Sequence, residues 1–428
     1  MTIEFYKEFG ELGYLANYSN YGFVKDGIYY KTVEHYYQSE KFDNKELKTK
    51  IINAKTPKEA SIIGRDRSNK RKDNFKQIKK QVMYNGILEK FRQNRDIAYK
   101  LIETRNKDIA EATIDEYYWG IGKDKSGENN IGKILVNVRE QIKKEIIDNI
   151  LQKCINKKIY IIGHDFSDAD SIFSSFLLAK ILQSKNIDAS YALLDTYGDF
   201  NSNDISLIED YIKEKPKIVD NNNLFILVDH NSLNGLDARN VLGAFDHHVL
   251  TGEVYDTIEM EYSSTCLLLY DIFKSSYQFS DYEKFLIFLS CLTDTDFLTS
   301  SRYTIEDKKL IKELNIKCDV NELQKKYFKM TDFNLSILDN LKQDYKEYEK
   351  NFKTIKRSII KSYSNDFLLH HKEYEEYIKS MTDDYLIIWP CYDKKITNVY
   401  YNGDWIKIDK VLTSTILILE ILEKKKLL

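Results

Sequence analysis

Short apolar runs alternate with helical segments in the middle of the chain, and this alternation constrains the fold more than any other feature. The runs are IYIIG at 159–163, ASYALL at 189–194, LFILVD at 224–229 and VLGAFD at 241–246. Continuous apolar strands separated by helices are typical of a parallel sheet that is covered on both faces. We therefore expect an α/β domain with a doubly wound parallel sheet over residues 155–305.

The flanking segments have different patterns. Residues 1–145 carry apolar residues at spacings of three and four, which predicts a mainly helical, α-rich first domain. One long helix over 130–157 is expected to link it to the sheet. Residues 306–358 are charged and predicted to be helical, and the alternating runs after them indicate strands and a terminal helix. We expect 306–428 to form a helical connection and a small α+β cap.

Composition and charge exclude several classes of protein. The chain has 428 residues, 43% hydrophobic and 31% charged, with a net charge of -3, so neither disorder nor a basic surface for nucleic acid or lipid is expected. The five cysteines form no CxxC pair, which indicates a reducing cytoplasm rather than a disulfide framework. No apolar run approaches the roughly 20 residues that span a bilayer, and no secretory signal is expected.

Acids and histidines follow several predicted strands. They are His164, Asp168, Asp170, Asp229, His230, Asp246, His247, His248 and Asp294. Residues at the carboxyl ends of parallel strands converge in space, and carboxylates with imidazoles are ligands for divalent ions. Two ions with a bridging aspartate would relieve the repulsion and could hold a hydroxide nucleophile for phosphoryl chemistry. The alternative is that these side chains only cap helices.

The motifs HDFSDAD, VDHN, DHH and TDT, in this order, resemble the metal-binding motifs of the DHH phosphoesterase superfamily, with VDHN closest to family II pyrophosphatases. The resemblance implies two divalent ions, manganese first and magnesium as the alternative. It implies one ion held by His164, Asp168 and Asp229. A second would be held by Asp170, Asp229, His247 and Asp294, with His248 facing substrate phosphate. Ser167 departs from the usual proline, and the SRK-type and GGGH motifs that mark particular substrates are missing.

A second set of polar residues lies near the N-terminus. In YKTVEHYYQSEKF, Glu34, Gln38 and Lys41 fall at i, i+4 and i+7 of a predicted helix. An acid, an amide and an amine on one face are groups that N-glycosidic cleavage needs, because a carboxylate stabilises the cationic sugar and an amine can capture its carbon. The alternative is a solvent-facing stripe with an ion pair.

The segment EATIDEYYWGIGKDKSGENNIG adds Glu116, Trp119 and Asn129 before the long helix. A turn rich in Gly and Asn that opens a helix can bind phosphate, and Trp119 can stack on a base or sugar.

Together, LANYSNYGF, DGIYYKTVEHYYQSEKF, KQVMYNGILEKFRQN and the EAT…WGIG segment resemble the NADAR family over residues 1–145. Members hydrolyse N-glycosidic bonds of phosphoribosylated compounds or of ADP-ribose on guanine. The resemblance implies that Glu34 and Lys41 are catalytic, Lys41 through a Schiff base to the opened ribose. It implies a further catalytic role for Glu116, which replaces the usual aspartate. The implied substrate-binding residues are Gln38, Trp119, Asn129 and Arg139.

Our hypothesis is a bifunctional hydrolase of nucleotide-sugar compounds, in which an N-glycosidase precedes a two-metal phosphoesterase. The expected substrates are a nucleotide, an ADP-ribosylated small molecule or a nucleic-acid base. One alternative is that the second half degrades short oligonucleotides or a dinucleotide signal, with Tyr392, Tyr400 and Tyr401 of the cap stacking on bases. The other is a non-catalytic ADP-ribose or nucleotide sensor. No membrane partner is expected, and homo-oligomerisation is left open.

Overall fold

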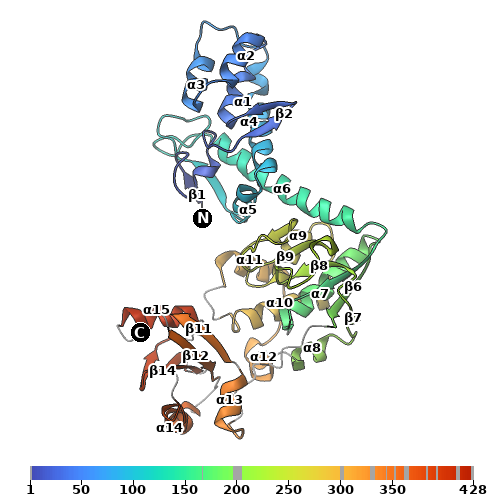
Figure 1. The fold of residues 1–428 in the computed structure, drawn as a ribbon, viewed down its shortest axis with the longest axis vertical. Coiled ribbons are helices and arrows are strands. Elements are labelled where there is room, and N and C mark those ends of the chain that lie inside the picture. Colours follow the sequence, from blue (N-terminus) through green and yellow to red (C-terminus); the bar gives the residue numbers. More distant parts are fainter. Residues whose placement is uncertain are drawn as a thin grey trace. The chain divides into compact units, whose positions relative to one another are not determined.

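The computed structural model describes residues 2–165, 167–195, 205–298, 303–327, 333–343, 345–350, 353–360, 366–381, 384–391, 394–410 and 415–425 (Figure 1). By internal contacts the chain divides into two compact units. The first comprises Met1–Lys157 and Asn231–Glu261, and the second comprises Lys158–His230 and Tyr262–Leu428. Within the described ranges, no helix combines the length and apolarity needed to cross a bilayer.

The N-terminal part of the first unit is mainly helical, as the periodicity predicts. Its elements are β1 (Thr2–Phe5), η1 (Gly13–Leu15), β2 (Phe23–Lys25), β3 (Ile28–Tyr30), α1 (Val33–Ser39), α2 (Lys45–Ile52), α3 (Pro57–Arg65), α4 (Phe75–Gln93), α5 (Arg95–Ile102), β4 (Asp108–Glu111) and α6 (Asn130–Cys154). Thr32, Asn44 and Thr56 begin α1, α2 and α3, and each accepts a hydrogen bond from the first turn of its helix. Strands β1 and β4 pair in parallel, while β2 and β3 form a hairpin.

The expected parallel sheet is present, and all four apolar runs form strands in it. The elements of this region are β5 (Lys158–Ile162), α7 (Ala169–Ser184), β6 (Asp188–Leu194), α8 (Ile205–Tyr211), β7 (Lys217–Val219), β8 (Leu224–Val228), η2 (Ala238–Asn240), β9 (Val241–Asp246), β10 (Thr257–Glu259), α9 (Thr265–Phe273) and α10 (Asp281–Asp294). The strand order is β10-β9-β8-β5-β6-β7. The pairs β10–β9, β5–β6, β5–β8 and β6–β7 are all parallel.

The C-terminal part of the second unit differs in one respect from the sequence prediction. Its elements are α11 (Ile305–Leu314), α12 (Val320–Tyr327), α13 (Ile337–Gln343), β11 (Tyr345–Lys350), β12 (Lys353–Ile359), α14 (Asp366–Lys379), β13 (Tyr385–Cys391), β14 (Ile396–Tyr401), β15 (Asp404–Ile408) and α15 (Thr415–Lys424). The prediction of helix up to residue 358 is wrong for β11 and β12, which form an antiparallel pair. Because β11 is an edge strand, its many charged side chains are compatible with strand structure.

The cap is built on the five-stranded sheet β11-β12-β13-β14-β15, which is covered on both faces (Figure 1). Successive residues of β13 point to opposite faces, so Leu386 and Ile388 pack in the same cluster as Ile418 and Leu422 of α15. On the other face, Ile387 and Trp389 share a cluster with residues of α13 and α14. This arrangement agrees with the expected α+β cap.

Within the first unit, α6 is attached to the segment that carries β9 and β10. Asp256, which directly precedes β10, accepts a hydrogen bond from Asn149 at 2.6 Å and pairs with Lys153 at 2.5 Å. Nearby, Glu259 of β10 is buried, and burial together with Glu103 raises its pKa to about 8. The buried Glu259 therefore favours its protonated form over a wide pH range.

We predict that Glu259→Gln stabilises the protein at pH 8. The pKa of Glu259 is raised in the folded state, so folding loses stability as the pH rises from about 4.5 towards 8. An amide avoids the charge and can donate to Glu103, so the gain should be about 1 kcal/mol or more at pH 8, since one pKa unit corresponds to about 1.4 kcal/mol. Urea unfolding at pH 8 and pH 4 measures it. Asp256→Asn is the matched control and should destabilise; equal midpoints for Glu259→Gln and the parent at pH 8 would contradict the prediction.

Candidate active sites

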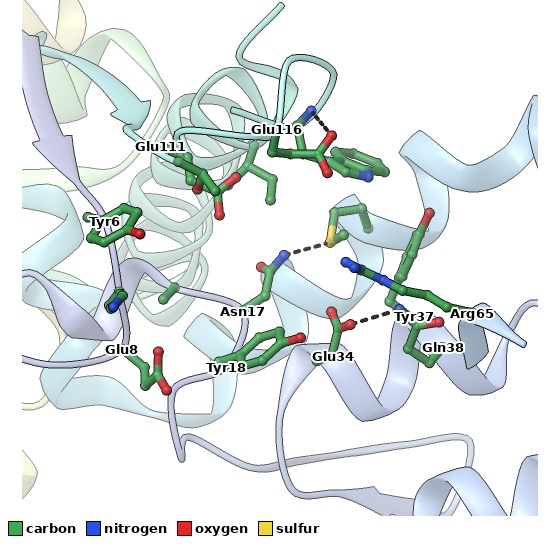
Figure 2. A pocket seen from close by; sticks show the side chains of 16 residues that line it. Tyr6, Glu8, Asn17, Tyr18, Glu34, Tyr37, Gln38, Arg65, Glu111 and Glu116 are labelled. Carbon is green, nitrogen blue, oxygen red and sulfur yellow. Dashed lines mark hydrogen bonds between the residues drawn. The ribbon is translucent and has the colours of Figure 1, made fainter. Parts of the chain in front are cut away.

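The N-terminal domain contains a cavity of about 280 Å³, here called the N-terminal pocket. Its lining includes the acids Glu8, Glu34, Glu111 and Glu116, the cations Lys7 and Arg65, the aromatic residues Tyr6, Tyr18, Tyr37 and Trp119, and the amides Asn17 and Gln38. Figure 2 shows Glu34 on one side of the pocket, Glu111 and Glu116 on the other, and Asn17 between them. The pocket thus combines opposed carboxylates with flat aromatic surfaces.

Helix α1 provides Glu34 and Gln38, as the i, i+4 spacing predicts. Gln38 Nε2 donates to Glu34 Oε1 at 2.7 Å, and both side chains are buried. Burial raises the pKa of Glu34, while the bond from Gln38 and the charges of Lys41 and Arg65 act in the opposite direction. The carboxylate is therefore dehydrated yet remains beside cations.

Lys41 does not continue this helix face, because α1 ends at Ser39. The amine is buried outside the pocket lining, where it donates to the carbonyl oxygen of Gly64 at 3.3 Å and lies 5.2 Å from the centre of the Tyr37 ring. Burial lowers its pKa to about 8, helped by the positive charge of Arg71 and opposed by Glu34. This amine therefore loses its proton more readily near neutral pH than a solvated lysine does.

The opposite wall contains a carboxyl group that the sequence reasoning did not assign to catalysis. Glu111 ends β4, and its N–H donates to Asn129 Oδ1 at 3.2 Å. Burial, with repulsion from Glu116, raises the pKa of Glu111 to about 7. The strand β4 has only four residues, so no periodic signal in the sequence indicated that Glu111 points into a pocket.

Three other predicted residues have clear positions. Trp119 lines the pocket and contacts the Tyr37 ring edge-to-face at 5.6 Å. Asn129 and Arg139 lie outside the lining: Asn129 Nδ2 donates to the carbonyl of Ile109, and the Arg139 guanidinium donates to Thr104 and to the carbonyl of Lys107. These two side chains stabilise the backbone near the pocket and do not form part of the pocket surface.

In the second unit, His164, Asp168 and Asp229 place one ligand atom each within 4.8 Å of one another. His164 Nε2 lies 3.6 Å from Asp168 Oδ2 and 3.4 Å from Asp229 Oδ2. Burial alone would lower the pKa of His164, but the two carboxylates outweigh it and raise that pKa to about 11. These atoms therefore attract positive charge, either a proton or a cation, and an imidazole with two carboxylates fits a divalent ion.

The loop that carries His164 is closed by local hydrogen bonds. Asp168 is the N-cap of α7 and accepts from the Ser171 N–H at 3.0 Å, while the Ser171 hydroxyl accepts from the His164 N–H at 3.0 Å. Ser167, at the position where proline is usual, donates to the carbonyl of His164 at 2.7 Å. A hydroxyl thus closes the loop that a proline ring would stiffen.

Asp170 is fully buried and is held by the start of α9. Asp170 Oδ2 accepts from the Thr265 N–H at 2.7 Å, and Oδ1 accepts from the Cys266 N–H at 3.0 Å and from the Ser290 hydroxyl at 2.5 Å. The Thr265 hydroxyl also donates to Asp229 Oδ1 at 3.2 Å. Such partners orient ligand carboxylates. Isolated hydroxyl residues are too common in sequences for this role to be predicted.

Two further groups of ligand atoms include His247. One contains Asp170, Asp229, His247 and Asp294, and the other contains Asp229, His247 and His248. His248 Nδ1 lies 2.9 Å from Asp246 Oδ1, which also accepts from the His248 N–H. Asp229 has a φ of 62°, a left-handed conformation that aspartate tolerates better than most residues.

The cap tyrosines proposed for base stacking are in different situations. Tyr400 and Tyr401 are buried in the two core clusters of the cap, so their rings are covered by protein. Tyr392 lies outside the described residues.

Two parts of the chain match known protein families. The family model "NADAR domain" matches residues 4–143, and the model "DHH family, N-terminal domain" matches residues 158–294. An N-glycosidase of Nostoc punctiforme is 36% identical over 33% of this chain and 94% of its own length. The N-glycosidase YbiA of Escherichia coli is 32% identical over 33% of this chain and 88% of its own. A solved structure described as a putative family II inorganic pyrophosphatase of Methanococcus jannaschii is 19% identical, covers 62% of this chain and 98% of its own, and has a TM-score of 0.46.

The chain therefore belongs to the NADAR family through its N-terminal domain, and the segment that follows this domain matches the DHH family model. Both families are hydrolases, so the protein is a hydrolase.

We predict that Mn²⁺ raises the thermal midpoint of the protein. Binding to the folded state alone stabilises by about 2.7 kcal/mol at 100 times the dissociation constant. Asp229→Asn should lose this response, because Asp229 belongs to all three ligand groups. Asp195→Asn, a strand-end aspartate outside those groups, should keep it. Differential scanning fluorimetry with and without Mn²⁺ is the measurement, and an unchanged response in Asp229→Asn would contradict the prediction.

Proposed function

We propose that the N-terminal domain is an N-glycosidase that removes an ADP-ribosyl or phosphoribosyl group from a base such as guanine. The observation that carries this proposal is the pair of opposed carboxyl groups, Glu34 and Glu111, in a pocket with an aromatic wall. The names of the N-glycosidase relatives support it. The predicted residues 1–145 contain every side chain that lines the pocket.

The two carboxyl groups have complementary roles. Cleavage of an N-glycosidic bond leaves positive charge on the sugar and needs a proton on the departing base. Glu34, beside Gln38, faces the sugar as a carboxylate. Glu111 keeps its proton near neutral pH and donates it to the base, with Glu116 beside it, while Trp119 stacks on the base.

Lys41 is the group that binds the sugar covalently. Its lowered pKa provides a neutral amine that attacks the anomeric carbon, and the bond from this carbon to the base breaks as Glu111 protonates the base. The sugar ring then opens to leave a Schiff base on Lys41, and water hydrolyses it to the free sugar and the amine. Because the amine lies outside the pocket lining beside Tyr37, the sugar carbon must approach it past that ring. Lys7 and Arg65, the cations of the lining, are the groups for substrate phosphate.

We further propose that residues 155–305, with the cap 306–428, form a two-metal phosphoesterase that cleaves a phosphoester or phosphoanhydride. His164, Asp168 and Asp229 would hold one divalent ion, and Asp170, Asp229, His247 and Asp294 a second, with His248 facing phosphate. The bound ions, manganese first, would supply a hydroxide and stabilise the developing charge. The five cysteines are free and four are buried, which supports the cytoplasm as the compartment.

The alternatives are less well supported. Degradation of oligonucleotides would need exposed aromatic faces, and Tyr400 and Tyr401 are buried. A sensor without turnover would not need a carboxyl group that keeps its proton near neutral pH opposite a second carboxylate.

We predict a bell-shaped pH dependence of base release with a maximum between about 7 and 8. Activity should fall as the pH rises through the pKa of Glu111, about 7, and should rise as Lys41 loses its proton near 8. Glu111→Gln should remove the alkaline decline and lower kcat about 100-fold or more. The test is kcat against pH on ADP-ribosylated guanosine. An unaltered profile in Glu111→Gln would exclude Glu111 as the proton donor.

We also predict that the two activities are separable. Lys41→Ala should abolish base release and preserve phosphate release, and Asp229→Ala should do the reverse. The measurement is manganese-dependent phosphate release from pyrophosphate, a dinucleotide and ADP-ribose, beside base release from ADP-ribosylated guanosine. Loss of both activities in one folded variant would show that the sites are not independent.

A further inference from the structure

Asn17 has an unusual position among the residues that line the N-terminal pocket. Its side chain is 8% exposed and lies between Glu34 and the opposite wall (Figure 2). Within the part of the chain that the structure describes, Asn17 Oδ1 has no hydrogen-bond partner, and Nδ2 donates only weakly, to the thioether sulfur of Met83 at 3.3 Å. A buried amide in this state is costly and requires an explanation.

The backbone around Asn17 is held by buried hydrogen bonds. Lys90 is 1% exposed, and its amine donates to the carbonyls of Tyr14 at 2.5 Å and Ala16 at 2.9 Å. The Asn17 carbonyl accepts from the N–H of Glu34 at 3.2 Å. A buried lysine and the first turn of α1 therefore hold the backbone that carries this amide, whereas the polar atoms of the amide itself lack strong partners.

We propose that Asn17 recognises the sugar of the substrate, with Oδ1 accepting a hydrogen bond from a ribose hydroxyl next to the anomeric carbon. This inference rests on the proposed N-glycosidase function. Asn17 adjoins Glu34, the carboxylate that faces the sugar, while the base lies at Trp119. The proton donors of a sugar next to its anomeric carbon are hydroxyls.

The chemistry of the amide narrows the substrate class. An amide presents one acceptor and one donor side by side, and the vicinal 2′ and 3′ hydroxyls of ribose can match both when Nδ2 leaves Met83. A 2′-deoxyribosyl compound would leave Oδ1 unpaired in a dry pocket. A site built to bond a hydroxyl rejects the analogue that lacks it strongly, so ribosyl substrates should be preferred by about 100-fold or more.

The test compares two asparagines with opposite environments. In Asn17→Leu an unsatisfied amide is removed, whereas in Asn94→Leu a satisfied one is removed, because Asn94 Nδ2 donates to the carbonyls of Gly22 at 3.0 Å and Lys90 at 2.7 Å. The first readout is kcat/KM for ADP-ribosylated guanosine and for its 2′-deoxyribosyl and 3′-deoxyribosyl forms, in which the ribose that is transferred to guanine lacks the 2′ or the 3′ hydroxyl. The second readout is the thermal midpoint without substrate. Calorimetry with ADP-ribose and its 2′-deoxy form measures recognition without turnover.

We expect Asn17→Leu to lower kcat/KM for the ribosyl substrate about 100-fold, to lower the 3′-deoxyribosyl value as well because that substrate keeps the 2′ hydroxyl, to change the 2′-deoxyribosyl value little, and to leave the thermal midpoint unchanged or higher. Asn94→Leu should lower the midpoint and keep the preference for ribose. Equal losses on all substrates in Asn17→Leu, or a midpoint that falls as in Asn94→Leu, would overturn the inference.

A parent protein that does not distinguish ribose from deoxyribose in turnover or binding would also overturn it. If the parent binds ADP-ribose in preference to the 2′-deoxy form and Asn17→Leu loses this preference, yet the parent releases no base, the glycosidase proposal fails while recognition by Asn17 stands.

Discussion

A carboxylate removed from water needs a proton, a hydrogen-bond donor or a cation, and this requirement links the main features of the protein. Glu111 meets it by keeping a proton, Glu34 by lying beside Gln38 and two cations, and Asp170 by accepting from two backbone N–H groups and a hydroxyl. The same group thus becomes an acid, a stabiliser of positive charge or a ligand, depending on its partner.

Helix ends provide many of these partners. The start of α9 donates to Asp170 through its backbone and to Asp229 through Thr265, and the start of α7 is capped by Asp168. Free N–H groups in a first helical turn favour negative charge, so short helices after strands can hold carboxylates that would otherwise repel one another. In the N-terminal domain the buried amine of Lys90 instead binds backbone, because it donates to the carbonyls on either side of Leu15.

Much of the fold could be predicted because its signals are long or repeated. Apolar runs predict the strands β5, β6, β8 and β9, and residues at strand ends predict where acids and histidines gather. Other features depend on contacts that leave no pattern. The prediction that Lys41 lies on the same helix face as Glu34 is wrong, because α1 ends at Ser39. The position of Glu111 in the pocket could not be predicted, because it ends a strand of only four residues. The composition of the edge strand β11 and of its neighbour β12 resembles that of a polar helix, so the sequence predicts helix where the structure has strands.

Helix α6 has a consequence for how such a fusion can be divided. Its first half follows Asn129, which holds Glu111, and its second half is bound through Asn149 and Lys153 to Asp256, about a hundred residues further along the chain. A gene cut after the helix would leave these side chains without their partner and expose a surface that the intact chain covers. Helix α6 and residues 231–261 therefore belong to one compact unit, and exchange of the N-terminal domain between proteins would require both segments to be exchanged together.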